Sequence, residues 1–212
     1  MAANRSEQIP PFIVMEVLER AKELEREGHK IIHMEIGEPD FDTPAKIKRA
    51  AIDAIERNET HYTHSLGILT LREAIVQHYK TKYSVTIHPD QVIVTQGTSP
   101  GLLLILCALL EKGDEIILTN PCYACYPNFV NYIDGMPVEI PISAEDGFIL
   151  HSEVTKKKIN PRTRAILINN PSNPTGTLFP LKTCDSWRSL DLTLFLMKFT
   201  TDWFTVKKNI PT

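Results

Sequence analysis

Apolar residues recur every three or four positions in three stretches of the N-terminal half, which predicts three amphipathic helices. The stretches cover residues 13–27, 44–57 and 69–83, with charged residues in between. Gly28 follows the first as a stop signal, and Pro44 stands at the first position of the second, where its missing N–H does no harm. Between these two helices, residues 30–36 predict a short strand that runs into a turn-rich segment, GEPDFDTP.

Beyond residue 90 the pattern changes to short apolar runs that alternate with helical segments. The runs at 91–95, 115–119, 138–140 and 164–169 predict strands. The apolar stretch 101–111 predicts a helix, and a shorter helix is expected after the loop NPCYACYP. Strands that alternate with helices are typical of a mostly parallel sheet. We therefore expect an α/β fold with helices on both faces of the sheet.

Composition narrows the function classes without naming one. The chain has 212 residues, a formal net charge of −3 and 42% hydrophobic residues, which excludes a disordered chain and a generally basic nucleic-acid binder. The longest apolar run, 102–110, falls short of the about 20 residues that a membrane span needs. The polar start lacks the apolar core of a signal peptide, and four cysteines are too few for a disulfide scaffold. These features predict a cytoplasmic protein with reduced thiols.

Three polar loops each follow a predicted strand. Gly97, Thr98 and Ser99 come between the run 91–95 and an apolar helix, where backbone N–H groups and hydroxyls suit a phosphate. Read alone, this turn favours a capping role for Thr98 or Ser99 over a phosphate site. The next two loops carry Tyr123 with Tyr126, and Asn170 with Asn173.

The chemistry of these two loops suits a planar ligand. A tyrosine ring stacks on an aromatic ligand, and an asparagine amide held among prolines bonds a ring oxygen or closes a local turn. Because open α/β sheets bind ligands at the carboxyl ends of their strands, we expect all three loops at one binding edge.

In this order, the motifs resemble those of a class I aminotransferase. They are IGEPDFDTP (36–44), YTHSLGILTLREAI (62–75), VIVTQGTSPGL (92–102), GDEIILTNPCYACYP (113–127) and NNPSNPTG (169–176). The resemblance covers residues 12 to about 180 in register. It implies the fold-type I architecture, pyridoxal 5′-phosphate as cofactor, and transfer of an amino group from an amino acid to a 2-oxo acid, in a homodimer of amino acid metabolism.

The resemblance also implies roles for single residues. Gly37 would lie beside the substrate carboxylate, and Tyr62 would reach the cofactor phosphate of the neighbouring subunit. Within one subunit, the phosphate would be held by Gly97, Thr98 and Ser99, the pyridine ring by stacking on Tyr123, and the ring oxygen by Asn173.

Several groups that the family uses have no counterpart in this sequence. These are the Asp that pairs with the pyridine nitrogen, the Tyr that follows it, the Lys that forms the Schiff base, and the C-terminal Arg. We therefore expect no catalytic residue and no transaminase activity in the 212-residue chain alone, and cofactor binding is doubtful. The resemblance divides the chain into a small-domain arm (1–40), part of the cofactor-binding large domain (41–180) and an aberrant tail (181–212).

Codon arithmetic favours a changed reading frame in that tail. Read one base early, the codons of residues 196–200 give Asp, Asn, His or Tyr, then Glu, then Ile or Val, then Tyr or His. This set includes the Asp-Glu-Ile-Tyr that the family carries near that distance after NPTG. The alternative is coincidence in a foreign or alternatively spliced tail.

Two further function classes stay open. The chain is a non-catalytic partner of a full-length aminotransferase if Tyr62 serves the neighbour's site. The CxxC pair Cys122 and Cys125 would fit a zinc or redox module, but no second pair at ligand spacing accompanies it. The run Lys156–Lys158 is typical of a solvated helix end, and we predict neither a metal site nor a membrane or nucleic-acid partner.

Overall fold

The computed structural model describes residues 9–180 and 192–197, and the chain divides into two compact units. One unit is Pro11–Thr95, and the other contains the described residues before Pro11 and those from Gln96 onward. The predicted domain boundaries at 40 and 180 stay predictions. None of the helices in the described part is long and apolar enough to cross a membrane.

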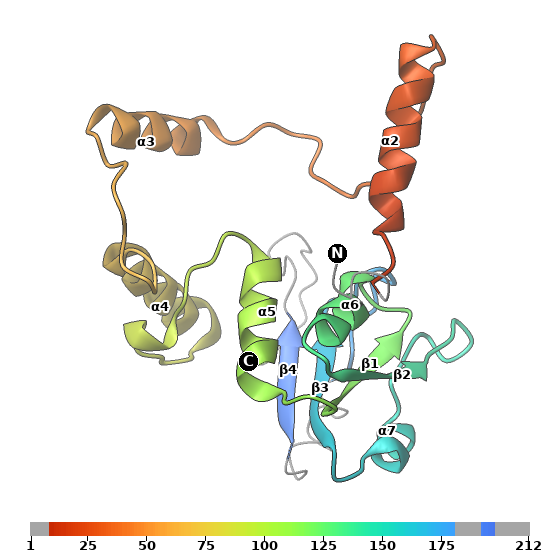
Figure 1. Ribbon diagram of the computed structural model, residues 1–212. Coiled ribbons are helices and arrows are strands. Elements are labelled where there is room, and N and C mark those ends of the chain that lie inside the picture. Colours follow the sequence, from red (N-terminus) through yellow and green to blue (C-terminus); the bar gives the residue numbers. More distant parts are fainter. Residues whose placement is uncertain (1–8, 181–191, 198–212) are drawn as a thin grey trace, which may run out of the picture. The chain divides into compact units, whose positions relative to one another are not determined.

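The unit Pro11–Thr95 is built from helices joined by extended segments (Figure 1). Helix α2 spans Ile13–Arg26, α3 spans Ala45–Glu56, α4 spans Leu69–Tyr83, and a short 3₁₀ helix covers Pro89–Gln91. The three predicted helices are thereby confirmed, with Pro44 at the cap of α3 rather than inside it.

The strands predicted at 30–36 and 91–95 are wrong, because both segments lie outside any strand. In the second segment, the Val94 N–H donates to the carbonyl of Leu66, in the loop before α4, at 3.0 Å. A strand needs a whole ladder of such bonds.

The second unit holds a four-stranded sheet in the order β2-β1-β3-β4, and every neighbouring pair is parallel (Figure 1). The strands are β1 (Glu115–Asn120), β2 (Met136–Pro141), β3 (Thr163–Asn169) and β4 (Thr193–Met197). Helices α5 (Thr98–Leu109), α6 (Cys125–Tyr132) and α7 (Ser152–Lys158) connect or precede them. This confirms the α/β fold class with a parallel sheet.

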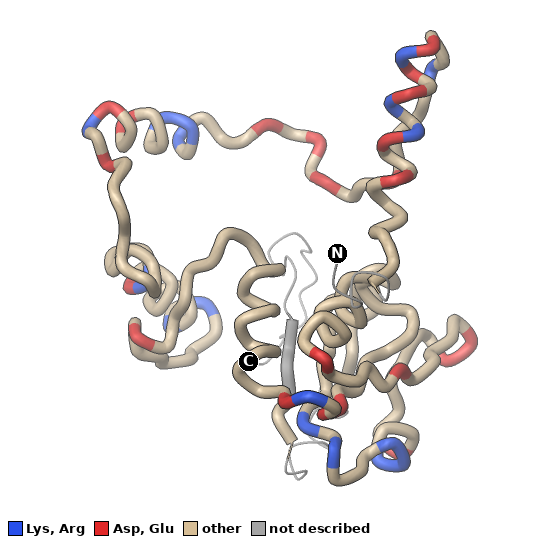
Figure 2. The backbone as a smooth tube through the Cα atoms, in the orientation of Figure 1, with Lys and Arg blue, Asp and Glu red and all other residues tan. Residues whose placement is uncertain are grey.

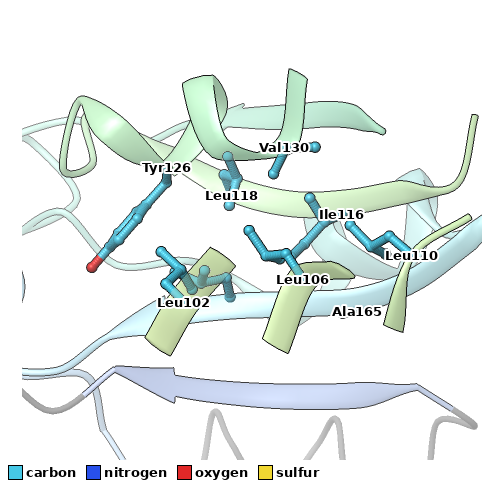
Figure 3. Close-up of a cluster of buried hydrophobic side chains, with 9 residues drawn as sticks. Leu102, Leu106, Leu110, Ile116, Leu118, Tyr126, Val130 and Ala165 are labelled. Carbon is cyan, nitrogen blue, oxygen red and sulfur yellow. The ribbon is translucent and has the colours of Figure 1, made fainter. Parts of the chain in front are cut away.

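Alternation along β1 and β3 divides the core into two layers. Side chains of one parity, such as Ile116 and Leu167, pack with α5 and α6, as Figure 3 shows for the labelled residues. Those of the other parity, such as Ile117 and Ile166, pack with Leu150 and other apolar residues on the opposite face. Because both faces of these strands are covered, their apolar runs are continuous rather than alternating.

The edge strand of the sheet, β4, gives a result that we did not expect for the tail. β4 lies within the segment 181–212, which we predicted to be aberrant, yet its backbone pairs with β3 from Ala165↔Thr193 to Asn169↔Met197. Its residues, Thr-Leu-Phe-Leu-Met, have the apolar, β-compatible character that a strand beside a buried neighbour requires. The rest of that tail lies outside the described residues.

Candidate active site

Helix α5 opens at the first predicted phosphate loop. Gly97 precedes it with φ of +95°, and no atom lies within 4 Å of the place a Cβ would take. Backbone conformation, not space, therefore favours glycine here. Thr98 and Ser99 are exposed and are the first residues of α5, which starts at Thr98 rather than at Gly101 as predicted. First-turn N–H groups have no acceptor inside a helix, so this end suits an anion.

The second loop joins β1 to α6 and carries Tyr123. The Tyr123 and Tyr126 rings meet edge to face with centroids 5.3 Å apart, and the carbonyl of Tyr123 accepts the backbone N–H of Tyr126 at 3.0 Å. A hydrogen bond with the Cys125 side chain, together with burial, raises the pKa of Tyr123 to about 12. Tyr123 is therefore a neutral, half-buried ring at the carboxyl end of β1.

The third loop follows β3 and is a hydrogen-bonded turn. The N–H of Ser172 donates to the Thr177 carbonyl at 2.9 Å, and the N–H of Gly176 donates to the Ser172 carbonyl at 2.8 Å. The Asn170 amide oxygen accepts the N–H of Phe179 at 3.1 Å, so this side chain closes the turn as the sequence allowed. Asn173 lies at the exposed part of the turn.

These three loops lie in one unit and follow the order that the sequence predicted. Because β1 and β3 are adjacent and parallel, the Tyr123 loop and the Asn173 turn leave the sheet at the same edge. Helix α5 packs on the same layer as α6 through Leu102 and Leu106. The structure thus gathers phosphate, ring and ring-oxygen candidates on the unit that begins at Gln96.

Gly37 and Tyr62 belong to the other unit, Pro11–Thr95. Gly37 is exposed, and Tyr62 is 108% exposed relative to its reference state. The loop after Tyr62 is nevertheless held: Gly67 N–H donates to the His64 carbonyl at 2.8 Å, and the buried Arg72 guanidinium donates to the Gly67 carbonyl at 3.3 Å. Tyr62 therefore projects from an ordered loop into solvent.

The CxxC pair lies on the loop that follows β1. Cys122 and Cys125 are free, and burial, with Glu139 nearby, raises the pKa of the Cys122 thiol to about 12. A thiol with that pKa stays protonated at neutral pH, and so it is a poor nucleophile. Within residues 9–180 and 192–197, no group of three or more His, Cys, Asp and Glu side chains is placed to hold a metal ion.

Two buried polar side chains lie near these loops: Asn169, which was not predicted as a site residue, and Tyr126, which was named only as a ring that could stack on a planar ligand. Asn169, the last residue of β3, is 6% exposed, and Tyr126 is 1% exposed. Neither the Asn169 amide nor the Tyr126 hydroxyl has a hydrogen-bond partner among the described residues. The available signal was an asparagine that ends an otherwise apolar strand.

Comparison with known proteins identifies the family. The model of the family "Aminotransferase class I and II" matches residues 29–189. The (5-formylfuran-3-yl)methyl phosphate transaminase of Methanocaldococcus jannaschii is 43% identical over 176 residues, which are 83% of this chain and 45% of that protein. The probable aspartate/prephenate aminotransferase of Aquifex aeolicus is 40% identical over 84% of this chain and 45% of its own length.

A solved structure extends the similarity to three dimensions. Aspartate aminotransferase from Thermus thermophilus with maleate superposes with a TM-score of 0.89 at 32% identity, over 93% of this chain and 53% of that one. The chain spans about 45% of the length of the two curated relatives described above. A family match over most of the chain and a shared parallel-sheet fold lead to one conclusion: this chain belongs to the class I and II aminotransferase family.

Proposed function

We propose that the unit from Gln96 onward carries the cofactor half of a pyridoxal 5′-phosphate aminotransferase site. The observation behind the proposal is the gathering of an open helix N-terminus, a neutral tyrosine ring and an exposed asparagine turn on one parallel sheet. In the complete family enzyme, such a site transfers an amino group from an amino acid to a 2-oxo acid, in a cytoplasmic homodimer.

The residues present fit this cofactor on chemical grounds. A phosphate matches the N–H groups of Thr98 and Ser99, and a planar ring matches the face of Tyr123. The unpartnered amide of Asn169 shows that the same region has polar groups available for a ligand.

When bound, the cofactor acts as an electron sink for the amino acid's Cα. The chain's own residues would bind and orient it: Gly97, Thr98 and Ser99 would hold the phosphate, Tyr123 would cover the ring, and Asn173 would donate to the ring oxygen. By resemblance to the family, Gly37 would bind the substrate carboxylate. The proton transfers need a base that this sequence does not place, so the 212-residue chain alone is inactive.

Binding of pyridoxamine 5′-phosphate tests this proposal, because this cofactor form has no aldehyde to react with surface lysines. We expect calorimetric binding by the purified chain and about tenfold weaker binding after Asn173→Ala, since one hydrogen bond is lost. Asn131→Ala, on α6, is the matched control. Transamination by the unaltered chain at the rate of an intact relative would contradict the predicted inactivity.

The tail belongs to the same proposal: residues from about 181 onward are read in a changed frame. The match to the family ends at residue 189, and β4 puts the backbone of residues 193–197 beside β3 at the point where the shifted codons give Asp, Asn, His or Tyr followed by Glu. Nucleotide sequence from codon 176 onward tests this. A shifted frame without Asp-Glu-Ile/Val-Tyr would refute it.

A second candidate function is supported by Tyr62. This side chain is fully exposed on a loop that hydrogen bonds hold, as expected if it serves a neighbouring subunit's cofactor. The chain would then be a non-catalytic partner of a full-length aminotransferase. We expect co-purification with such an enzyme and a changed rate on mixing, both reduced by Tyr62→Ala. No association at micromolar concentration would exclude this role.

A further inference from the structure

Two orphaned polar groups lie buried at the carboxyl end of the sheet. The amide nitrogen and oxygen of Asn169 and the hydroxyl of Tyr126 have no hydrogen-bond partner among the described residues. Asn169 is 6% exposed and Tyr126 is 1% exposed, so bulk water does not take the place of a partner. Leaving such groups unpaired is unfavourable, and folded proteins rarely tolerate it without a reason.

Strand alternation places both groups on one face of the sheet. Ala165 and Leu167 of β3 belong to the cluster that contains Tyr126. Asn169 lies two residues after Leu167 in the same strand, so its side chain is on the same face. Its side chain therefore belongs to the α5 and α6 face. Ile166 and Ile168 pack in the other layer, which leaves Asn169 as the polar end of an apolar row.

The same groups also share one end of the sheet. Asn169 is the last residue of β3 and pairs in register with Met197, the last residue of β4. Figure 3 shows the Tyr126 hydroxyl pointing away from Ile116 and Leu110, toward the end where the β4 arrowhead lies, with Leu102 of α5 beside the ring. Both orphans thus face the edge from which the cofactor loops emerge.

Each orphan is also directly connected to a predicted cofactor residue. Tyr126 packs edge to face on Tyr123 at 5.3 Å, and burial raises its pKa further, so its hydroxyl stays neutral and able to donate. Asn169 ends the strand that leads into the turn Ser172–Thr177, which contains Asn173. An amide that can both donate and accept suits the mixed donors and acceptors of a substituted pyridine ring.

We infer that Asn169 is a further cofactor-binding residue, which hydrogen-bonds the bound pyridoxal phosphate together with the Tyr126 hydroxyl. The inference rests on the proposed function. It explains why an unpaired buried amide is retained: the group is unsatisfied in the empty chain because its partner is the ligand. Sites that bind ligands often keep such locally unfavourable groups.

The test compares the effect of one substitution on the melting temperature with its effect on cofactor binding. In Asn169→Leu, an apolar side chain of similar size replaces the orphaned amide, so the melting temperature of the chain without cofactor stays equal or rises. Calorimetry with pyridoxamine 5′-phosphate should show a Kd about tenfold or more above that of the unaltered chain. Asn131→Leu on α6 is the control. A lower melting temperature with unchanged Kd would make the amide purely structural and overturn the inference.

Two more variants separate this inference from the proposed function. If Ser99→Ala and Asn173→Ala weaken binding but Asn169→Leu does not, the inference alone is wrong. If the unaltered chain binds no pyridoxamine 5′-phosphate, the proposed cofactor site fails and the inference fails with it. Should Asn169→Leu not fold, Tyr126→Phe decides: weaker binding at an unchanged melting temperature supports the shared pocket, and unchanged binding overturns it.

Discussion

The imidazole of His33 lies between two carboxylates. Its Nδ1 is 2.6 Å from Glu35 Oε1, and its Nε2 is 2.9 Å from Glu25 Oε1 on α2. The hydrogen bond to Glu35, followed by that to Glu25, raises the pKa of His33 above 6.5. A raised folded-state pKa gives a stabilisation that is complete below the unfolded pKa and is lost as pH rises through the folded value. The link between α2 and the following segment is therefore strongest in mild acid.

We predict that an NMR titration finds the His33 pKa above 6.5 and that both carboxylates contribute to it. Glu35→Gln should lower this pKa more than Glu25→Gln does, because the bond to Glu35 is the larger cause. Glu19→Gln, a substitution on the same helix, should leave the His33 pKa unchanged. A His33 pKa at or below 6.5 in the unaltered chain would show that the paired geometry does not persist in solution.

Gly67 holds the loop of Tyr62 in a conformation that only glycine fits. Its φ is +98°, and an added Cβ would lie 2.6 Å from the Val94 Cβ. Gly28, in the same unit, has φ of +92° but no atom within 4 Å of its Cβ position. We predict that Gly28→Ala costs about 1–2 kcal/mol of unfolding free energy from backbone strain. Gly67→Ala should cost about 1–3 kcal/mol more, from overpacking. Urea unfolding followed by circular dichroism measures both, and equal losses would contradict the close contact.

Among the secondary-structure elements, the local sequence pattern predicted the bounds of those helices and strands that depend mainly on neighbouring residues. The bounds 69–83 of α4 match the apolar periodicity, and β1 and β3 lie within one residue of their predicted limits. The segments 30–36 and 91–95 have strand-like composition but no ladder in the described residues, because pairing depends on chain far away in sequence. The same limit applies to the site: motif order located Asn173, whereas the unpaired state of Asn169 depends on what packs around it.

At the start of β1, a carboxylate joins this strand to the segment that precedes β3. Glu115, 5% exposed, accepts from Arg162 Nη2 at 2.7 Å and from Asn160 Nδ2 at 2.7 Å. We predict that Glu115→Gln lowers the unfolding free energy by about 1–3 kcal/mol, since hydrogen bonds to a charged, buried acceptor are lost. Glu139→Gln is the matched control in β2: its carboxylate accepts from Asn120 at 2.6 Å but is exposed, so the change should stay within about 0.5 kcal/mol.

Within the unit that contains the sheet, basic residues lie away from the proposed cofactor edge. Figure 2 shows Lys and Arg gathered around α7 and the start of β3, at the amino ends of the strands. Arg162 and Arg164 there are paired with Glu115 and Asp114. The Glu111 backbone N–H, together with Arg164, holds the pKa of Asp114 below its usual 3.8, so this pairing weakens only as pH falls through that lower value. Arg162 and Arg164 thus stabilise the amino ends of β1 and β3.

At the scale of the whole chain, helix α5 presents an exposed apolar surface. Helix α5 buries Leu102 and Leu106 but leaves Leu104 59% and Ile105 42% exposed. The helix carries no charged residue to keep that face hydrated. The matched part of the two curated relatives is about 45% of their own length. Exposed apolar patches of this kind drive self-association.

We predict that the purified chain self-associates through this face and that Leu104→Lys with Ile105→Lys reverses it. Burying each side chain contributes about 1.5–3 kcal/mol, so removing both should weaken association by tenfold or more, about 1.4 kcal/mol per factor of ten. Multi-angle light scattering should then report a mass near the 24.0 kDa of one chain. Gln77→Lys adds charge to an exposed position on α4 without removing apolar surface, and should leave association unchanged. Only the double variant removes the contact surface itself. If Gln77→Lys reduces the measured mass of the assemblies by the same amount, net charge rather than the α5 face controls self-association.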